Sequence, residues 1–257
     1  MTGRLTLSWL EYDFLWEHLG LGRRPPVLDI NSHGRTFDER AELRAAAWKS
    51  LAGKGFGEPG NIHPDVENCL RALARPKWEV DGRLHLSADG PRTSVLVGAN
   101  RARAAVGVLD AEHLTVWRTS ADGLARALVG QLPDHPPGTG VSITLPAETL
   151  DVCAARAGSD PDALGRALVS AGLGKDEARK IVAVIGRVVR FGHLGAAHTP
   201  RHGDRVRADH VVSFYDNPLG RYLFTRRAQW VTLAPGSPSA VTRQVEELLH
   251  GLALIRR

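Results

Sequence analysis

Two similar runs of secondary structure follow one another in this sequence, and the repeat limits the possible folds more than any other feature. Each run predicts two helices, then several strands, then a helix. The clearest overlap has an offset of 117 residues, which places Leu114-Thr115-Val116 over Val231-Thr232-Leu233 and Ser120 over Ser237. Consecutive strands without helices between them pair antiparallel. The repeat therefore predicts an antiparallel sheet assembled around a pseudo-two-fold axis.

The apolar residues change from a helical to an alternating period at matching points of the two halves. Asp38, His63, Ser120 and Asp160 are candidate helix starts. The predicted helices are 9–19, 38–51, 63–73, 120–132, 160–171, 178–185 and 237–249, and the predicted strands are 4–7, 78–86, 93–99, 101–109, 113–118, 188–194, 206–215, 221–226 and 230–233.

This order defines the fold class as α+β, with a central antiparallel β-sheet that carries a quasi-two-fold internal repeat and is flanked by helical bundles. The strands do not alternate with helices, as they would in a doubly wound fold. We expect residues 1–257 to form one domain of two pseudo-symmetric halves, about 1–135 and 141–257, joined by a segment rich in Pro and Gly. A chain of this length can bury a sizeable core.

The charge balance leaves several partners open. The chain has 33 basic and 28 acidic residues, a net charge of +5, and only five of its basic residues are lysine. Such arginine usage is typical of a GC-rich genome, but a basic chain also suits nucleic acid. Arginines and aromatics alternate in the second half, as in a stacking surface or, equally, in a half-buried strand pair. They are Arg201, Arg205, Arg207, Arg221, Arg226 and Arg227, with Phe214, Tyr215, Tyr222 and Phe224.

Motifs for catalysis, metals and phosphate loops are absent from the sequence. Lys175 in the glycine-rich stretch 172–175 is followed by Asp176, where a phosphate loop needs Ser or Thr. The histidines near residues 193–210 match no helical zinc spacing, and the polar stretch 196–207 favours an exposed hairpin loop. Cys69 and Cys153 are isolated and read as buried free thiols. We therefore expect no metal, no cofactor and no enzyme activity.

The apolar runs are too short for a membrane span. The longest, 181–189, is interrupted by Gly186 and Arg187. Acidic residues near the N-terminus break the apolar run that a signal peptide requires. We expect a cytoplasmic protein without membrane insertion.

Several short motifs, taken in order, resemble one known family. Together they resemble the EspG family of ESX (type VII) secretion-associated chaperones of actinobacteria, over nearly the whole chain. The motifs are Gly34-Arg35-Thr36 with Glu39-Arg40, Leu73-Ala74-Arg75-Pro76, Asn217-Pro218-Leu219-Gly220-Arg221, Gln229-Trp230-Val231 and Ala234-Pro235-Gly236.

The resemblance implies a cytoplasmic chaperone that is not an enzyme and that binds secretion substrates, typically PE–PPE heterodimers. Family members shield an aggregation-prone client tip and aid its delivery to the secretion machinery. The implied client surface comprises the sheet face, the loop between the second and third strands, here a short one near residues 87–92, and the C-terminal helical region. The residues expected to bind the client are Asp89, Pro91, Arg92, Arg205, Arg207, Arg221 and Arg226.

Two other functions remain open from the sequence. A basic nucleic-acid-binding or regulatory protein is the main alternative, although no helix-turn-helix, RRM or zinc-finger pattern supports it. An enzyme of unfamiliar type comes third and would need a pocket of converging titratable groups. An antiparallel sheet with uncovered edges could also pair with a second copy, so a homodimer stays open.

Overall fold

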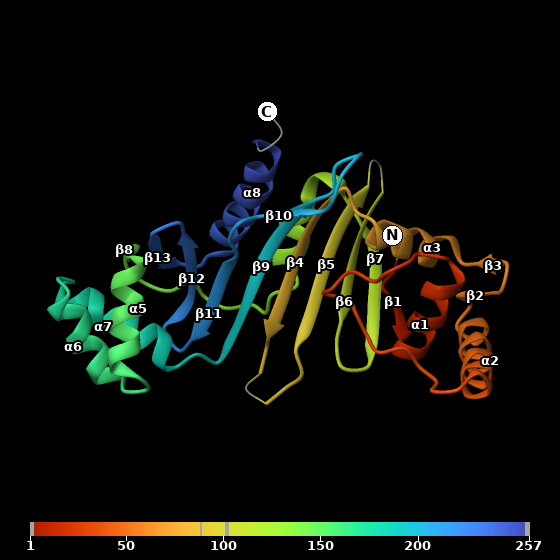
Figure 1. Cartoon of the computed structure of the whole chain (residues 1–257), viewed down its shortest axis with the longest axis horizontal. Coiled ribbons are helices and arrows are strands. Elements are labelled where there is room, and N and C mark those ends of the chain that lie inside the picture. Colours follow the sequence, from red (N-terminus) through yellow and green to blue (C-terminus); the bar gives the residue numbers. More distant parts are fainter. Residues whose placement is uncertain (1–2, 88, 101–102, 255–257) are drawn as a thin grey trace. The chain divides into compact units, whose positions relative to one another are not determined.

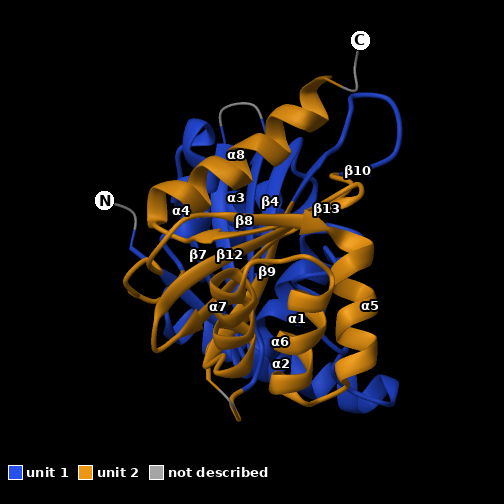
Figure 2. Cartoon of the chain, turned by 90° about the vertical axis from the view of Figure 1, so that its left-hand side faces the viewer, with its two compact units in different colours: residues 1–83, 91–131, 196–207 blue, residues 84–90, 132–195, 208–257 orange. Residues whose placement is uncertain are grey.

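The computed structural model describes residues 3–87, 89–100 and 103–254, so Arg101 and Ala102 of one predicted strand lie outside the described residues. Two compact units make up the chain (Figure 2). Unit 1 comprises residues 1–83, 91–131 and 196–207, and unit 2 comprises residues 84–90, 132–195 and 208–257. Each half of the chain thus contributes a segment to the unit built mainly from the other half.

Unit 1 is an antiparallel sheet with helices (Figure 1). Its strand order is β1-β7-β6-β5-β4. Helices α1 and α3 pack on one face of this sheet, where Leu96, Leu114 and Val116 are buried with them. The elements are β1 (Leu5–Ser8), α1 (Trp9–His18), α2 (Phe37–Gly53), β2 (Gly57–Glu58), β3 (Asn61–Ile62), α3 (Pro64–Ala74), β4 (Trp78–His85), β5 (Thr93–Asn100), β6 (Arg103–Leu109), β7 (His113–Thr119), a 3₁₀ turn (Ala121–Gly123), α4 (Leu124–Val129) and β10 (Val206–Arg207).

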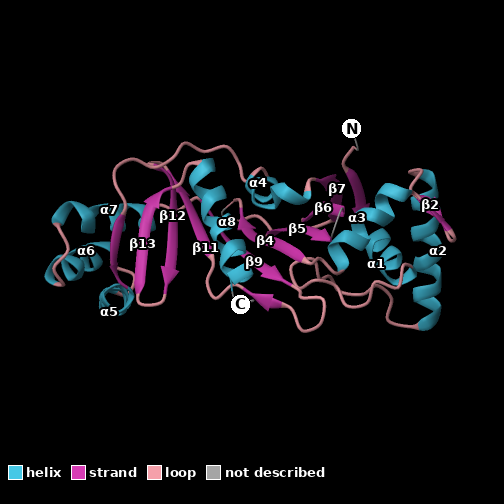
Figure 3. Ribbon diagram, turned by 90° about the horizontal axis from the view of Figure 1, so that it is seen from above, coloured by secondary structure: helices cyan, strands magenta, loops and turns pink. Residues whose placement is uncertain are grey.

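Unit 2 repeats the order of a strand, three helices, four strands and a helix, without counterparts of β2, β3 and the 3₁₀ turn in its described residues. Its helices and strands are labelled in Figure 3. Its strand order is β9-β11-β12-β13-β8. Ile181 of α7 and Leu150 of α5 are buried against Val231 and Leu233 of the sheet. The elements are β8 (Ile143–Pro146), α5 (Ala147–Ala157), α6 (Pro161–Ser170), α7 (Lys175–Gly186), β9 (Arg190–His198), β11 (Val212–Asn217), β12 (Gly220–Arg227), β13 (Trp230–Pro235) and α8 (Pro238–Leu254).

The strand registers confirm the internal repeat. Leu5 pairs with Val116 in unit 1, and Ile143 pairs with Leu233 in unit 2. The expected offset of 117 therefore holds for β7 and β13, and an offset of 138 relates β1 to β8. The repeat extends to side chains, because the hydroxyls of Thr6 and Thr115 lie 3.1 Å apart and those of Thr144 and Thr232 lie 3.0 Å apart. The α+β fold with a twice-repeated antiparallel sheet is confirmed.

Helix caps recur at equivalent positions. The Ser120 hydroxyl accepts from the backbone N–H of Asp122, and the Ser237 hydroxyl accepts from that of Ala240. A side-chain oxygen at this place satisfies a backbone donor that the helix itself leaves unpaired. The alignment of Ser120 with Ser237 in the sequence therefore reflects a shared cap.

Two local predictions were wrong, and two elements were missed. Strand β8 and helix α5, residues 143–157, were not predicted. The predicted strand 206–215 is two strands, β10 and β11, separated by residues 208–211. Residues 196–198 were expected in an exposed loop, but Ala196 and Ala197 are fully buried in β9. Small apolar side chains of this kind fit a buried strand as well as a loop, so composition alone could not distinguish the two.

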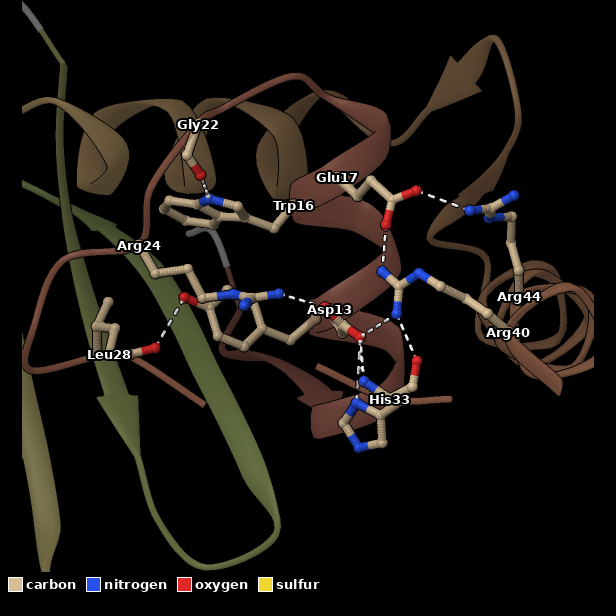
Figure 4. Close-up of polar contacts among 10 residues, drawn as sticks. Asp13, Trp16, Glu17, Gly22, Arg24, Leu28, His33, Arg40 and Arg44 are labelled. Atoms are coloured by element: carbon tan, nitrogen blue, oxygen red, sulfur yellow. Dashed lines mark hydrogen bonds and ion pairs between the residues drawn. The ribbon is translucent and has the colours of Figure 1, made fainter. Parts of the chain in front are cut away.

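A long connection between α1 and α2 completes the core of unit 1 (Figure 4). We call residues 20–30 the plug. The plug buries Leu21, Val27 and Leu28 against the helices and the sheet. Trp16 Nε1 donates to the Gly22 carbonyl at 2.7 Å, and Tyr12 Oη donates to the Leu28 carbonyl at 3.0 Å.

A buried carboxylate ties this connection to α1. The Asp13 side chain is 2% exposed and pairs with the guanidinium groups of Arg24 and Arg40. It also accepts from the backbone N–H of His33 at 2.8 Å. Burial alone would raise the pKa of Asp13, but the His33, Arg40 and Arg24 hydrogen bonds outweigh burial and hold the pKa below its ordinary value. The ionised form of Asp13 therefore stabilises the fold.

We predict that Asp13→Asn lowers the free energy of unfolding by about 3 kcal/mol at pH 7, because the partly buried guanidinium of Arg24 loses its carboxylate partner and Arg40 keeps only Glu17. The native pKa of Asp13 is depressed, so its contribution is present above the unfolded pKa and is lost as the pH falls through the native pKa. The difference between variant and wild type should therefore shrink below about pH 4. Urea unfolding at pH 7 and pH 3.5 measures both values.

The internal repeat supplies the control. Asp151 of α5 occupies the position of Asp13, but it forms an exposed pair with Arg226. Asp151→Asn should leave stability close to that of wild type. Equal losses for the two variants would contradict the role assigned to Asp13.

Candidate client-binding surface

The β4–β5 connection presents three of the predicted client-binding residues. Asp89, Pro91 and Arg92 are all exposed between β4 and β5. No ion pair involves Asp89 or Arg92 in the described part of the chain. The connection therefore offers charges of both signs to a partner.

Arg205 and Arg207 lie on the segment that returns from β9 through β10 within unit 1, and both reach carboxylates of β4. Arg207 forms a bidentate pair with Asp81, with N–O distances of 2.6 and 2.9 Å. Arg205 Nε donates to Glu79 Oε1 at 2.8 Å. The carboxylates are buried, whereas the arginine side chains remain about one third exposed. The two arginines therefore hold β10 in place and still present their outer edges to solvent.

The Glu79 and Arg207 sites differ in their electrostatics. Burial raises the pKa of Glu79 above its ordinary value, even though Arg205 beside it acts in the opposite direction. The Asp81 carboxylate raises the pKa of Arg207, which is already charged at neutral pH. The favourable interaction with Arg205 therefore does not fully offset the free energy of desolvating the ionised Glu79 carboxylate.

Arg221 occupies a different environment from the one expected. Its side chain is 2% exposed and forms a bidentate pair with Asp216, at 2.7 and 2.8 Å. The same guanidinium donates to the Pro133 carbonyl at 2.8 Å. In this structure Arg221 fastens the segment that precedes β8 to β12, and its guanidinium is used inside unit 2.

Arg226 pairs with Asp151 on α5, at 3.0 and 2.5 Å, and both side chains are about half exposed. Asp151 lies at the edge of an apolar cavity of about 330 Å³ in unit 2. The cavity is bounded by α5, α7 and the sheet, with Ile185, Tyr215 and Phe224 among its lining residues. Sequence reasoning missed this feature because it missed α5.

The described residues offer no candidate metal site. They contain no group of three or more His, Cys, Asp or Glu side chains placed to hold a metal. His193 hydrogen-bonds Ser213 at 2.8 Å, and His210 lies beside Asp209, so these two histidines serve different neighbours. Cys69 is buried, and burial raises the pKa of its thiol to about 11. A thiol of this kind is not a reactive nucleophile.

No helix in the described part of the chain is long and apolar enough to cross a membrane.

The chain thus combines a repeated antiparallel sheet with exposed charged loops and an apolar cavity in unit 2. The sequence model of the EspG family matches residues 8–247, and the chain belongs to this family. No curated protein matches the chain. Among solved structures, the chain is similar to the Mycobacterium tuberculosis type VII secretion system chaperone EspG5 in complex with a PE25–PPE41 dimer. That match has a TM-score of 0.76 and 15% sequence identity, and covers 96% of each chain, so it shows a shared fold.

We predict that Glu79→Gln increases stability at neutral pH. The raised native pKa of Glu79 means that wild type loses stability as the pH rises from the unfolded to the native pKa. Glutamine has no charge to desolvate and still accepts a hydrogen bond from Arg205. The gain should be absent near pH 4 and should grow as the pH rises through the raised native pKa of Glu79.

Urea unfolding across this pH range measures the gain. Glu58→Gln, on the short strand β2, is the control and should show no such pH dependence, because Glu58 is exposed. A loss of stability for Glu79→Gln at pH 8 would show that pairing with Arg205 outweighs burial.

Proposed function

We propose that this protein is a cytoplasmic chaperone of a type VII (ESX) secretion system. It binds helical secretion substrates of the PE–PPE kind, shields their aggregation-prone tip and aids their delivery to the secretion machinery. Membership of the EspG family carries the proposal. The fold shared with EspG5, whose structure was solved with a PE–PPE dimer, supports it.

The exposed apolar side chains of unit 2 suit the binding of a protein without any catalysed reaction. Unit 2 exposes large apolar side chains, among them Ile185, Val189 and Trp230. Large exposed apolar side chains of this kind are candidate contacts for a protein partner. Binding of this kind requires no cofactor and no catalytic group, so the protein is not an enzyme in this account.

The predicted residues that carry charge at the surface are proposed to contact the client, and we call them the rim residues. Asp89, Pro91 and Arg92 are exposed on the β4–β5 connection, and Arg205, Arg207 and Arg226 are partly exposed arginines. Arg221 contributes indirectly, by holding β12 to the segment that precedes β8. Rim charges of this kind steer association and fix orientation more than they add affinity.

The ion pairs also favour a protein client over nucleic acid. Arg205, Arg207 and Arg226 each face a carboxylate of the chain itself. Phosphate binding depends on unneutralised positive charge and weakens steeply with salt. A paired arginine offers a mixed-charge surface, which is typical of a protein interface.

We predict that the tagged protein co-purifies with small helical secreted proteins encoded beside it, in a complex that survives about 0.3 M salt, where exposed charge contacts are screened. Size-exclusion chromatography identifies the client and shows whether the chaperone is a monomer or a homodimer. Absence of any such complex, with nucleic acid co-eluting and lost at high salt, would contradict the proposal.

The rim is tested by charge reversal. Arg92→Glu combined with Asp89→Lys should weaken client binding about three- to tenfold. Lys49→Glu, at an exposed position of α2, is the charge-reversal control and should leave it unchanged. Equal binding by all three proteins would remove the β4–β5 connection from the client surface.

A further inference from the structure

The apolar cavity of unit 2 lies at the place where unit 1 has a filled core. The offset of 138 residues that relates β1 to β8 continues through the first helix of each unit. Both helices are followed by a glycine with positive φ, Gly20 at 61° and Gly158 at 57°. The equivalent positions are Leu7 and Leu145, Tyr12 and Leu150, Asp13 and Asp151, Trp16 and Ala154, and Gly20 and Gly158.

In unit 1 the plug occupies this place. Residues 19–36 connect α1 to α2, and Val27 and Leu28 of this connection are buried in the core. Trp16 and Tyr12 hydrogen-bond plug carbonyls, and Asp13 pairs with Arg24 of the plug (Figure 4). We call the place between the first helix and the sheet that the plug occupies the seat. In unit 1 the seat receives two aliphatic side chains, Val27 and Leu28, and Arg24 lies nearby.

In unit 2 no such segment is present. Residues 158–160 alone connect α5 to α6, and they are too short to form a plug. The position of Trp16 is taken by Ala154, which is exposed. The last turn of α7 shows the same difference, because Ile185 is 46% exposed whereas Leu73, at the matching place in α3, is fully buried.

The sheet side of the two seats also differs. By the offset of 117, Gly98 and Gly107 of unit 1 correspond to Tyr215 and Phe224 of unit 2. A side chain on Gly107 would meet Leu73 at 2.8 Å and plug residue Leu28 at 3.3 Å, so this glycine lets the helix and the plug approach the sheet. The aromatic rings in unit 2 fill part of the seat, and about 330 Å³ remains.

The remaining space has the size and lining of a binding site. Its volume is at the lower end of the range for ligand pockets, which is enough for one or two side chains. Tyr215 lines it, and none of the described residues hydrogen-bonds the Tyr215 hydroxyl. Asp151 lies at its edge, where Asp13 of unit 1 receives Arg24.

We propose that this cavity receives an extended segment of a partner protein that carries neighbouring large aliphatic side chains and a basic residue close to them. The segment would occupy unit 2 as the plug occupies unit 1. Its aliphatic side chains fill the cavity, its basic residue competes with Arg226 for Asp151, and a backbone carbonyl can accept from Tyr215. The inference rests on the proposed function for the partner, which is the secreted client.

Filling the cavity tests the inference. Ala154→Trp restores the residue that unit 1 has at this position and should weaken client binding at least tenfold. Ile185→Glu places a charge at an already exposed cavity position and should have the same effect. Ala155→Trp is the matched control, because Ala155 is exposed on the same helix and does not line the cavity. Thermal unfolding checks that all three variants fold.

A second probe is independent of the client. A synthetic peptide with the plug sequence, residues 20–30, is titrated at millimolar concentration while methyl NMR signals of Leu145, Ile181 and Val231 are followed. These signals should shift in wild type and Ala155→Trp, and not in Ala154→Trp.

The outcomes separate the two proposals. Undiminished client binding by Ala154→Trp and Ile185→Glu would overturn the cavity inference and leave the chaperone function standing. If the peptide shifts the methyl signals but no client protein co-purifies, the cavity inference is supported and the chaperone function is contradicted. Neither client binding nor peptide shifts would overturn both.

Discussion

The architecture of unit 1 depends on the ion pairs and hydrogen bond of one buried carboxylate, that of Asp13. It pairs with Arg24 and Arg40 and accepts from the His33 backbone, so it fastens the long α1–α2 connection to the first helix. Fastened in this way, the plug buries Val27 and Leu28 and completes the core. A buried charge is tolerated only where such partners surround it. The equivalent Asp151 has no plug to bind and forms an exposed ion pair instead.

The two units therefore share a plan and differ in packing. Glycines at positions 98 and 107 allow close approach in unit 1, whereas Tyr215 and Phe224 hold the equivalent space partly open in unit 2. Close packing stabilises a fold, and sites that bind partners often give up part of this stability. A duplicated architecture can separate the two requirements, with one unit closed for stability and the other left open for a client.

Much of the fold was predictable from the sequence, because hydrophobic period and helix caps are local signals. The offset of 117 that relates β7 to β13 was visible in the sequence and is confirmed by the registers. Helix α5 was missed because Pro146 stands at the position of the capping Ser8 and alanines stand at the positions of Trp9 and Trp16. The offset of 138 and the shared Asp and Gly were the signal that could have found it. The ion pairs of Arg205 and Arg207 join residues 126 positions apart and have no local signature. Their use in client binding, like that of the other rim residues, stays a prediction.

The central claim is that the cavity of unit 2 receives a segment of the client, whereas the plug fills the corresponding place in unit 1. Hydrogen–deuterium exchange of the protein alone and in its client complex tests this claim most directly. The account predicts slower exchange on binding in α5, α7 and β11–β12, residues 147–157, 175–186 and 212–227, with α1 and the plug unchanged. Protection confined to α1, α2 and the plug, with unit 2 unaffected, would contradict it.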